Sequence, residues 1–404
     1  MKIALVHEWL VSMRGGEKVF LEICRLFPNA EIYTLVHRPG GVDADIEAHR
    51  LHTSFLQKIP GSARHYPKLL PLFPMAIEAF DLTPYDLVIS SSHCVAKGVI
   101  TRPEALHVSY IHSPMRYIWD LHFIYFPRGE GNFLKRALYR SVANYLRLWD
   151  VASSNRVDKM IANSRFVARR IWKYYRRKAG VVHPPVDVDQ FSVSSQVDGY
   201  YLAFSSLVPY KRLDLAIQAF NQLRLPLKII GGGSERAALE KLAGPNIEFL
   251  DWLPDHEMRR VLARARALIF PGVEDFGIIP VEANACGVPV IAFGTGGVLD
   301  TIIPLDEHDH PNRQPTGLFF PEQTVEAIRR AVERFEKQQI FFQNRQAIRQ
   351  TTFRFHPDVF RRKITAHVAQ TARRRGLDFQ PEITAPVRAF DETKFVREPA
   401  ACLA

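Results

Sequence analysis

Short runs of β-branched and other apolar residues alternate with longer helical patterns along most of the chain. In the first half, such runs predict strands at residues 3–7, 87–90, 108–112, 160–162 and 181–183. In the second half, further runs predict strands at residues 201–204, 227–230, 247–250, 267–270 and 288–292. Alternation of this kind is typical of repeated βα units with parallel sheets. The pattern therefore predicts an α/β fold with two Rossmann-like domains.

The break between the two series locates the domain boundaries. Proline cannot donate to a strand ladder, so Pro184-Pro185 ends the first series, and the polar stretch 192–199 has little to bury. Beyond residue 325 the pattern becomes helical and basic, and the last residues look irregular. We expect an N-terminal domain at residues 1–185, a linker at 186–199 and a C-terminal domain at 200–345. We further expect helices at 346–375 that pack back on the N-terminal domain, and an irregular tail at 376–404.

The composition is that of a folded protein with two cores. The chain has 404 residues, of which 47% are hydrophobic and 24% charged. No apolar run reaches the roughly 18–20 residues that cross a bilayer. The four cysteines lie far apart without metal-ligand spacing, so the sequence predicts neither a zinc site nor disulfide bonds. We expect a cytoplasmic protein.

The net charge of +11 predicts a polyanionic partner. The sequence contains no zinc finger, RNP-type aromatic pair or short helix-turn-helix unit, so we do not expect nucleic acid as the main partner. The segment 122–159 mixes aromatic residues with arginines and lysines. That mixture is typical of a surface that rests on an anionic membrane, and it fits a core helix with a solvated basic face equally well.

The most specific motif is the segment 271–283, which directly follows the strand predicted at 267–270. Gly277 allows close backbone approach, and Pro280 suits the first turn of a helix whose free amides would face an anion. Glu274 and Glu282 lie eight positions apart, so one carboxylate is expected on the loop and the other inside the helix. Together they could hold two polar parts of one ligand, although acids near a helix N-terminus are also favourable by themselves.

This segment resembles the E-x7-E motif of retaining glycosyltransferases of family 4, which have the GT-B architecture of two Rossmann-like domains facing across a cleft. The resemblance implies that Glu274 holds donor-sugar hydroxyls and that Glu282 holds the ribose. It also implies that backbone amides near the sugar and diphosphate come from Phe276, Gly277, Ile278 and Ile279.

Two further features of the first half resemble the same family. Gly15 and Gly16 follow the first strand, where glycines let the backbone approach a phosphate at a helix start. His112 ends the strand 108–111 and precedes a segment similar to the family's active-site histidine loop. A lone histidine at a strand end is usually structural, but the resemblance implies contact with the donor sugar near the reaction centre.

The segment 205–212 is similar to the family's phosphate-binding stretch, in which an arginine precedes a lysine by five residues. Lys211 matches the lysine, whereas Ser206 stands in place of the arginine. A missing guanidinium weakens stabilisation of the leaving diphosphate unless another cation replaces it, and Arg212 is the candidate replacement. Gly232, in the glycine run 231–233, resembles part of the loop near the nucleotide base, and the turn 294–297 resembles another family turn.

One metal motif is rejected. Asp187-Val188-Asp189 matches the DxD pattern of the other major glycosyltransferase architecture, but it lies in the predicted linker beside Pro184-Pro185. We therefore expect no metal and no cofactor. The diphosphate charge would instead be met by Lys211, helix N-termini and backbone amides.

The resemblance implies a hexosyltransferase that retains the anomeric configuration, with His112, Lys211 and Glu274 as catalytic residues. Three segments resemble mannosyltransferases of bacterial surface-polysaccharide and lipopolysaccharide synthesis: His-Glu-Trp-Leu at 7–10, Ser-Ser-Ser-His at 90–93 and the loop 111–117. This resemblance favours GDP-mannose as the donor. The acceptor would be a saccharide or a polyprenyl-diphosphate-linked saccharide bound by the N-terminal domain, at the inner face of the plasma membrane. A UDP-hexose donor, a GT-B nucleotide-sugar epimerase and a non-catalytic nucleotide-sugar-binding paralogue remain alternatives.

Overall fold

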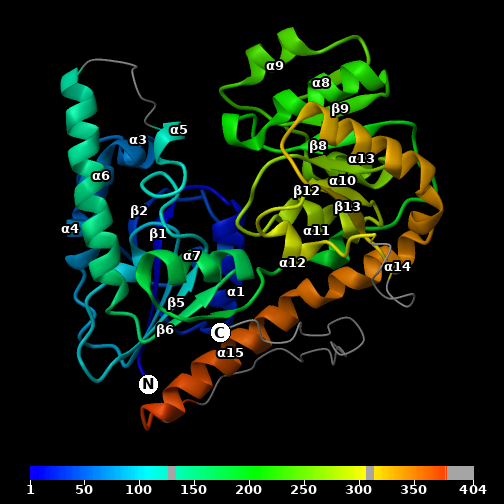
Figure 1. Ribbon diagram of the computed structural model, residues 1–404. Coiled ribbons are helices and arrows are strands. Elements are labelled where there is room, and N and C mark those ends of the chain that lie inside the picture. Colours follow the sequence, from blue (N-terminus) through cyan, green and yellow to red (C-terminus); the bar gives the residue numbers. More distant parts are fainter. Residues whose placement is uncertain (126–132, 306–313, 378, 380–404) are drawn as a thin grey trace. The chain divides into compact units, whose positions relative to one another are not determined.

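The computed structural model describes residues 1–125, 133–305, 314–377 and 379. These residues form two compact units, each built around one parallel sheet (Figure 1). Unit 1 contains Met1–Pro185 and the described residues from Phe360 onward, and unit 2 contains Val186–Val359. The predicted α/β fold with two Rossmann-like domains is confirmed. The predicted tail lies almost entirely outside the described residues, as do residues 126–132 of the aromatic and basic segment.

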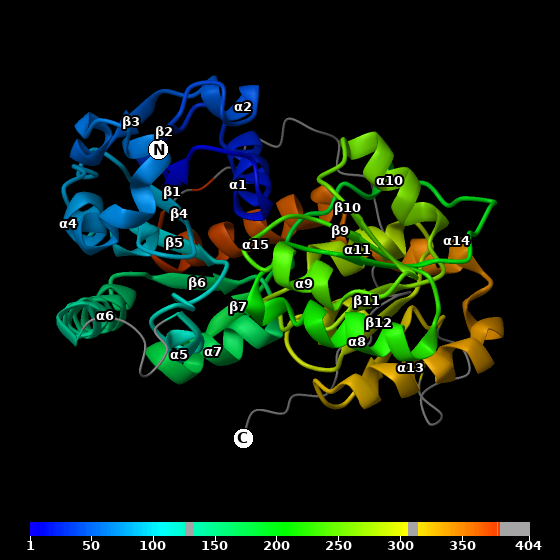
Figure 2. The same cartoon turned by 90° about the horizontal axis from the view of Figure 1, so that it is seen from above.

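Unit 1 contains a seven-stranded sheet with the order β3-β2-β1-β4-β5-β6-β7, which can be followed in Figure 2. Its strands are β1 Ile3–Leu10, β2 Glu31–His37, β3 Leu51–Thr53, β4 Leu87–Ser92, β5 Leu106–Ile111, β6 Lys159–Ala162 and β7 Ala179–Val181. The chain runs outward from β1 through β2 and β3, and then places β4 on the other side of β1. Such a reversal opens a crevice outside the carboxyl ends of the two central strands. A ligand site is therefore expected where β1 and β4 end.

Apolar stripes attach the helices to this sheet. In α1, Val19, Phe20 and Ile23 are buried on one face, as expected for apolar positions three and four residues apart. The helices are α1 Gly15–Leu26, α2 Ala44–Glu47, α3 Ser62–His65, α4 Phe73–Glu78, α5 His122–Tyr125, α6 Phe133–Ser154 and α7 Arg165–Tyr175. Short 3-10 helices are η1 Phe55–Lys58, η2 Tyr66–Leu72 and η3 Ala96–Gly98. None of the described helices is long and apolar enough to span a membrane.

The C-terminal helix α15, Pro357–Arg374, completes the core of unit 1. Its buried apolar residues recur every four positions, at Phe360, Ile364, Val368 and Ala372. The Phe360 ring meets the Tyr110 ring edge-on at 5.6 Å between centroids. The segment 346–375 is thus divided, because Ile348 and Phe355 are buried in the cores of unit 2.

Unit 2 contains a six-stranded sheet with the order β10-β9-β8-β11-β12-β13. Its strands are β8 Tyr201–Phe204, β9 Leu227–Ile230, β10 Ile247–Leu250, β11 Leu268–Phe270, β12 Val290–Phe293 and β13 Gly317–Phe320. Its helices are α8 Leu213–Leu223, α9 Arg236–Leu242, α10 Asp255–Arg264, α11 Ile278–Ala285, α12 Val298–Thr301, α13 Val325–Lys337 and α14 Arg345–Gln350. Its 3-10 helices are η4 Val188–Gln190, η5 Pro209–Lys211, η6 Gln339–Phe342 and η7 Thr351–Phe355.

The predicted linker 186–199 packs on unit 2. Val186, Val188 and Phe191 are buried in its core. The Val186 amide also donates a 2.8 Å hydrogen bond to the Phe355 carbonyl oxygen. Because β8 lies between β9 and β11, the loops that follow β8 and β11 emerge side by side at the carboxyl edge of the sheet. This edge carries most of the predicted donor-site residues.

Candidate functional site

His112 lies at the carboxyl edge of unit 1, directly after β5. Its Nε2 atom is 2.8 Å from Ser91 Oγ at the end of the neighbouring strand β4. Its backbone N–H donates to the Ser92 carbonyl oxygen at 2.8 Å, and its carbonyl oxygen accepts from Asn163 Nδ2 at 2.8 Å. The ring is thus fixed by neighbouring strand ends.

The His112 imidazole is neutral near pH 7. Removal of the ring from water lowers its pKa to about 3, and the nearby His93 and His7 rings contribute in the same direction. A neutral imidazole of such low basicity suits hydrogen bonding to a hydroxyl better than proton abstraction.

The glycine pair Gly15-Gly16 begins α1, after Arg14 as the N-cap residue. The Arg14 backbone N–H donates to Glu17 Oε2 at 3.0 Å, so the N3 side chain satisfies the amide of the N-cap residue. A Cβ atom at Gly16 would lie 3.8 Å from His7 Cε1, so this helix start lies beside His7 in the second half of β1. The free amides of the first turn therefore lie at the same edge of the sheet as the strand-end histidines.

Sequence reasoning used the segments that contain Glu8 and His93 only as marks of a family resemblance and assigned neither residue to the site. Glu8 Oε2 lies 3.2 Å from His93 Nδ1, and the Glu8 side chain is fully buried whereas that of His93 is 31% exposed. Glu8 belongs to the segment His-Glu-Trp-Leu in β1, and His93 follows the three serines that end β4. Because the two residues are 85 positions apart in the chain, no local pattern indicated their contact.

In unit 2, Lys211 and Glu274 form an ion pair between the loops that follow β8 and β11. Lys211 ends η5, and its side chain is 13% exposed, against 18% for that of Glu274. A Cβ atom at Gly272 would lie only 3.0 Å from Lys211 Cα, so the lack of a side chain at Gly272 allows the two loops to approach each other. Two predicted catalytic residues are thus brought together, although they are 63 positions apart in the chain.

The second part of the motif builds the start of α11. Gly277 is the N-cap residue with φ +90°, a left-handed conformation that favours glycine. The Phe276 side chain is buried and meets the Phe355 ring edge-on at 5.5 Å, so only its backbone can serve a ligand. Ile278 and Ile279 open the helix, where amides have no partner within the helix, and Glu282 is buried farther along.

The turn 294–297 packs against the loop that contains Glu274 and Phe276. The Gly297 N–H donates to the Glu274 carbonyl oxygen at 2.8 Å. A Cβ atom at Gly296 would lie 2.6 Å from that oxygen, and one at Gly297 would lie 2.3 Å from Phe276 Cα. These glycines are required for packing against the Glu274 loop.

The remaining predicted donor residues differ in their surroundings. Ser206 is exposed, whereas Arg212 Nε and one terminal nitrogen bind the two carboxylate oxygens of Asp214, each at 3.1 Å. A role for Arg212 in ligand binding would require this pair to open. Gly232 packs under an exposed indole, since a Cβ atom there would lie 3.1 Å from Trp252 Nε1.

Asp187 and Asp189 have partners within unit 2. Asp187 Oδ2 accepts a 2.5 Å hydrogen bond from Gln190 Nε2, and Asp189 Oδ2 lies 3.3 Å from His356 Nε2. Among the residues that the structure describes, no group of three or more histidine, cysteine or acidic side chains could hold a metal ion.

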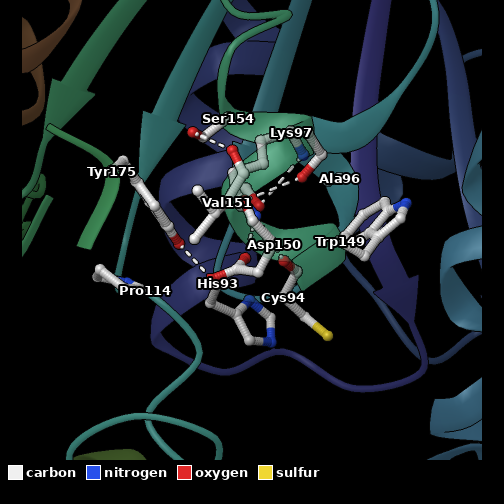
Figure 3. Close-up of polar contacts among 12 residues, drawn as sticks. His93, Cys94, Ala96, Lys97, Pro114, Trp149, Asp150, Val151, Ser154 and Tyr175 are labelled. Carbon is white, nitrogen blue, oxygen red and sulfur yellow. Dashed lines mark hydrogen bonds and ion pairs between the residues drawn. The ribbon is translucent and has the colours of Figure 1, made fainter. Parts of the chain in front are cut away.

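The helix α6 combines a buried anchor with several exposed apolar side chains. Lys97 and Asp150 form a buried ion pair (Figure 3), and Asp150 Oδ2 accepts hydrogen bonds of 2.8 Å each from Trp119 Nε1 and the Tyr175 hydroxyl. Figures 1 and 2 both show α6 at the margin of unit 1. Exposed large side chains on α5 and α6, here called the α5–α6 face, are Phe123, Ile124, Tyr125, Leu138, Tyr139, Tyr145 and Leu148.

Comparisons with known proteins agree with this architecture. Residues 13–190 match the family model of Glycosyltransferase Family 4, and residues 188–354 match that of glycosyl transferases group 1. A GDP-mannose-dependent alpha-(1-6)-phosphatidylinositol monomannoside mannosyltransferase of Mycolicibacterium smegmatis is 29% identical over 37% of this chain and 47% of that protein. An alpha-1,3/1,6-mannosyltransferase ALG2 of Candida glabrata is 23% identical over 44% of this chain and 50% of that protein. The matches thus span half or less of these relatives.

Solved structures resemble the whole fold. Anabaena HepE in complex with UDP has a TM-score of 0.63 at 16% identity, covering 92% of this chain and all of that chain. WaaG, a glycosyltransferase involved in lipopolysaccharide biosynthesis, has a TM-score of 0.59 at 16% identity, covering 90% of this chain and 98% of that chain. At these identities, the likeness concerns the fold alone.

Proposed function

This chain belongs to the GT-B glycosyltransferases of family 4, and we propose that it transfers mannose from GDP-mannose, with retention of configuration, to a saccharide or lipid-linked saccharide. The observation that carries the proposal is the ion pair between Lys211 and Glu274 beside the start of α11. A cation, a carboxylate and free helix amides together match a negatively charged sugar nucleotide. Mannosyltransferases among the relatives favour mannose as the transferred sugar.

Donor binding would exchange the partners of this ion pair. The Lys211 ammonium would turn to the diphosphate, and the Glu274 carboxylate would accept hydrogen bonds from sugar hydroxyls. The amides of Gly277, Ile278 and Ile279 would stabilise the leaving diphosphate, because charge grows there as the sugar departs. Glu282 would accept the ribose hydroxyls. These cationic and backbone donors support a reaction that needs no metal ion.

Retention is accounted for by transfer on one face of the sugar. The bond from the anomeric carbon to the phosphate oxygen breaks, and the bond to the acceptor oxygen forms on the same side. The acceptor proton passes to a phosphate oxygen of the leaving group. The neutral His112 imidazole would hold a sugar hydroxyl rather than take this proton. Orientation of the two reactants then supplies much of the rate.

The α5–α6 face supports a peripheral position on the inner face of the plasma membrane. Its exposed apolar side chains lie beside the exposed Arg140, and the chain carries a net charge of +11. Aromatic and cationic groups together bind the interface of anionic membranes. Sedimentation with phosphatidylglycerol vesicles tests this partner, and Leu148→Glu should reduce binding to the vesicles. Leu242→Glu on α9 makes the same change from an apolar to a charged side chain and, as the control, should not reduce binding.

A transfer assay tests the activity itself. Radiolabelled GDP-mannose is incubated with lipid-linked saccharides from bacterial membranes, and the label in the extracted lipid is counted. We expect transfer by the native protein and none by Glu274→Gln. Equal labelling from both would contradict the role of Glu274, and isomerisation of the sugar without any acceptor would identify an epimerase instead.

A further inference from the structure

One charged pair at the edge of unit 1, Glu8 and His93, has no role in the proposed sugar transfer. Glu8 lies in the last part of β1, and His93 directly follows β4. The rings of His93 and His112 are 6.2 Å apart and nearly perpendicular. The pair therefore lies beside the histidine expected to contact the donor sugar.

The surroundings of Glu8 favour its ionised form. Its Oε1 atom accepts hydrogen bonds from the Ser92 hydroxyl at 3.0 Å and from the backbone amides of His93, Cys94 and Ala96 at 2.9, 2.8 and 3.2 Å. Burial alone would raise the pKa of Glu8, but the His93 charge and these donors hold it far below its usual range. A buried carboxylate thus faces His93.

The carboxylate in turn favours the charged form of His93. Burial opposes that charge, yet the attraction of Glu8 raises the pKa of His93 above its ordinary value, with a smaller contribution from Glu17 on α1. The other ring neighbours are Trp9 at 4.7 Å and His7 at 6.1 Å. Nδ1 faces Glu8 and the side chain is 31% exposed, so Nε2 is the ring nitrogen that can serve a ligand.

We propose that His93 binds a phosphoryl oxygen of the ligand held at His112, and that Glu8 positions the His93 ring. Sugar hydroxyls are satisfied by neutral groups such as His112, whereas an imidazolium is matched by an anion. The start of α1 at Gly15-Gly16 lies at the same edge and favours an anion as well. The inference rests on the proposed function, because it requires a phosphate-bearing substrate. The phosphoryl group belongs either to the donor or to a lipid-diphosphate acceptor.

Calorimetric titration with GDP at about pH 6 and about pH 8.5 tests the donor arm. We compare the native protein with His93→Gln, which removes the charge, His93→Lys, which fixes it, and Glu8→Gln. We expect His93→Gln to weaken binding about tenfold at the lower pH and to abolish its pH dependence. His93→Lys should retain binding at both values, and Glu8→Gln should move the midpoint to lower pH. His65→Gln, at an exposed position, is the matched control.

Steady-state kinetics test the acceptor arm. If GDP affinity is unchanged but His93→Gln raises KM for the lipid-linked acceptor in the same pH-dependent way, the phosphoryl group belongs to the acceptor. If the native protein is active but His93→Gln changes neither GDP affinity nor KM for the acceptor, the inference is overturned and the proposed function stays intact. A native protein that neither binds a nucleotide nor transfers sugar contradicts the proposed function first. Because Glu8→Gln removes a buried charge, its fold is checked by thermal unfolding, and the two His93 variants decide if it does not fold.

Discussion

The carboxyl edges of the two sheets are built from different materials. In unit 1, side chains converge from strand ends far apart in the chain: Glu8, His93 and His112. In unit 2, the edge is made of glycine-rich loops, the free amides of α11 and one lysine–glutamate pair. The first edge offers shaped side-chain contacts for neutral and charged groups, and the second offers a backbone that can approach a diphosphate closely. The same sheet architecture thus serves two chemistries.

We expect the largest effect from a substitution at the carboxyl edge of the unit 2 sheet. Lys211→Met removes the cation that would stabilise the leaving diphosphate, so kcat should fall about 10²–10³-fold, as for other transition-state donors. Release of GDP from GDP-mannose measures it. Lys241→Met on α9 is the control, and a fall of less than threefold in Lys211→Met would remove this lysine from the catalytic step.

We expect the next largest effect from a substitution at the carboxyl edge of the unit 1 sheet. His112→Ala removes a hydrogen-bond partner of the sugar but no charge, so we expect a loss of about tenfold to a hundredfold in kcat/KM with little change in GDP affinity. Kinetics and calorimetry on the same preparation separate the two quantities. A large loss of GDP affinity would instead assign His112 to the nucleotide.

Acid should destabilise unit 1 through its buried histidines. Burial lowers the pKa of His107 to about 3, while the unfolded chain titrates near 6.5. The unfolded chain therefore binds the proton more readily, and the free energy of unfolding should fall by up to about 1.4 kcal/mol per pH unit for this one group as the pH drops below 6.5. Denaturant titrations of the native protein and His107→Asn between pH 7 and about pH 5 measure the slope. An unchanged slope in the variant would contradict this origin.

We expect the smallest effect from a substitution of Arg212 at the carboxyl edge of the unit 2 sheet. Arg212 is bound by Asp214 within its own turn. Arg212→Gln should therefore change both kcat and the GDP dissociation constant by less than about threefold, whereas Lys211→Met should lower kcat far more. A loss as large as that of Lys211→Met would show that Arg212 leaves Asp214 and replaces the arginine missing at Ser206.

The sequence predicted unit 2 more completely than unit 1, for a physical reason. Glu274, Gly277 and Glu282 lie in one continuous loop and helix, so their spacing reveals their arrangement. The contact between Glu8 and His93 depends on the pairing of β1 with β4, which no local pattern specifies. The strands β2, β3 and β13 were not predicted, although β2 and β13 contain apolar runs. The Phe276 side chain could not be assigned to the core before its contact with Phe355 was seen.

The most direct test of the donor site is calorimetric binding of GDP, UDP and ADP, each with and without Mg²⁺, to the native protein and to Glu282→Ala. We expect selective, metal-independent binding of GDP that is lost in Glu282→Ala, because the ribose loses its carboxylate partner. Selective binding of UDP would replace the donor while keeping the site. Absence of binding by any of the three nucleotides would contradict the proposed glycosyl transfer.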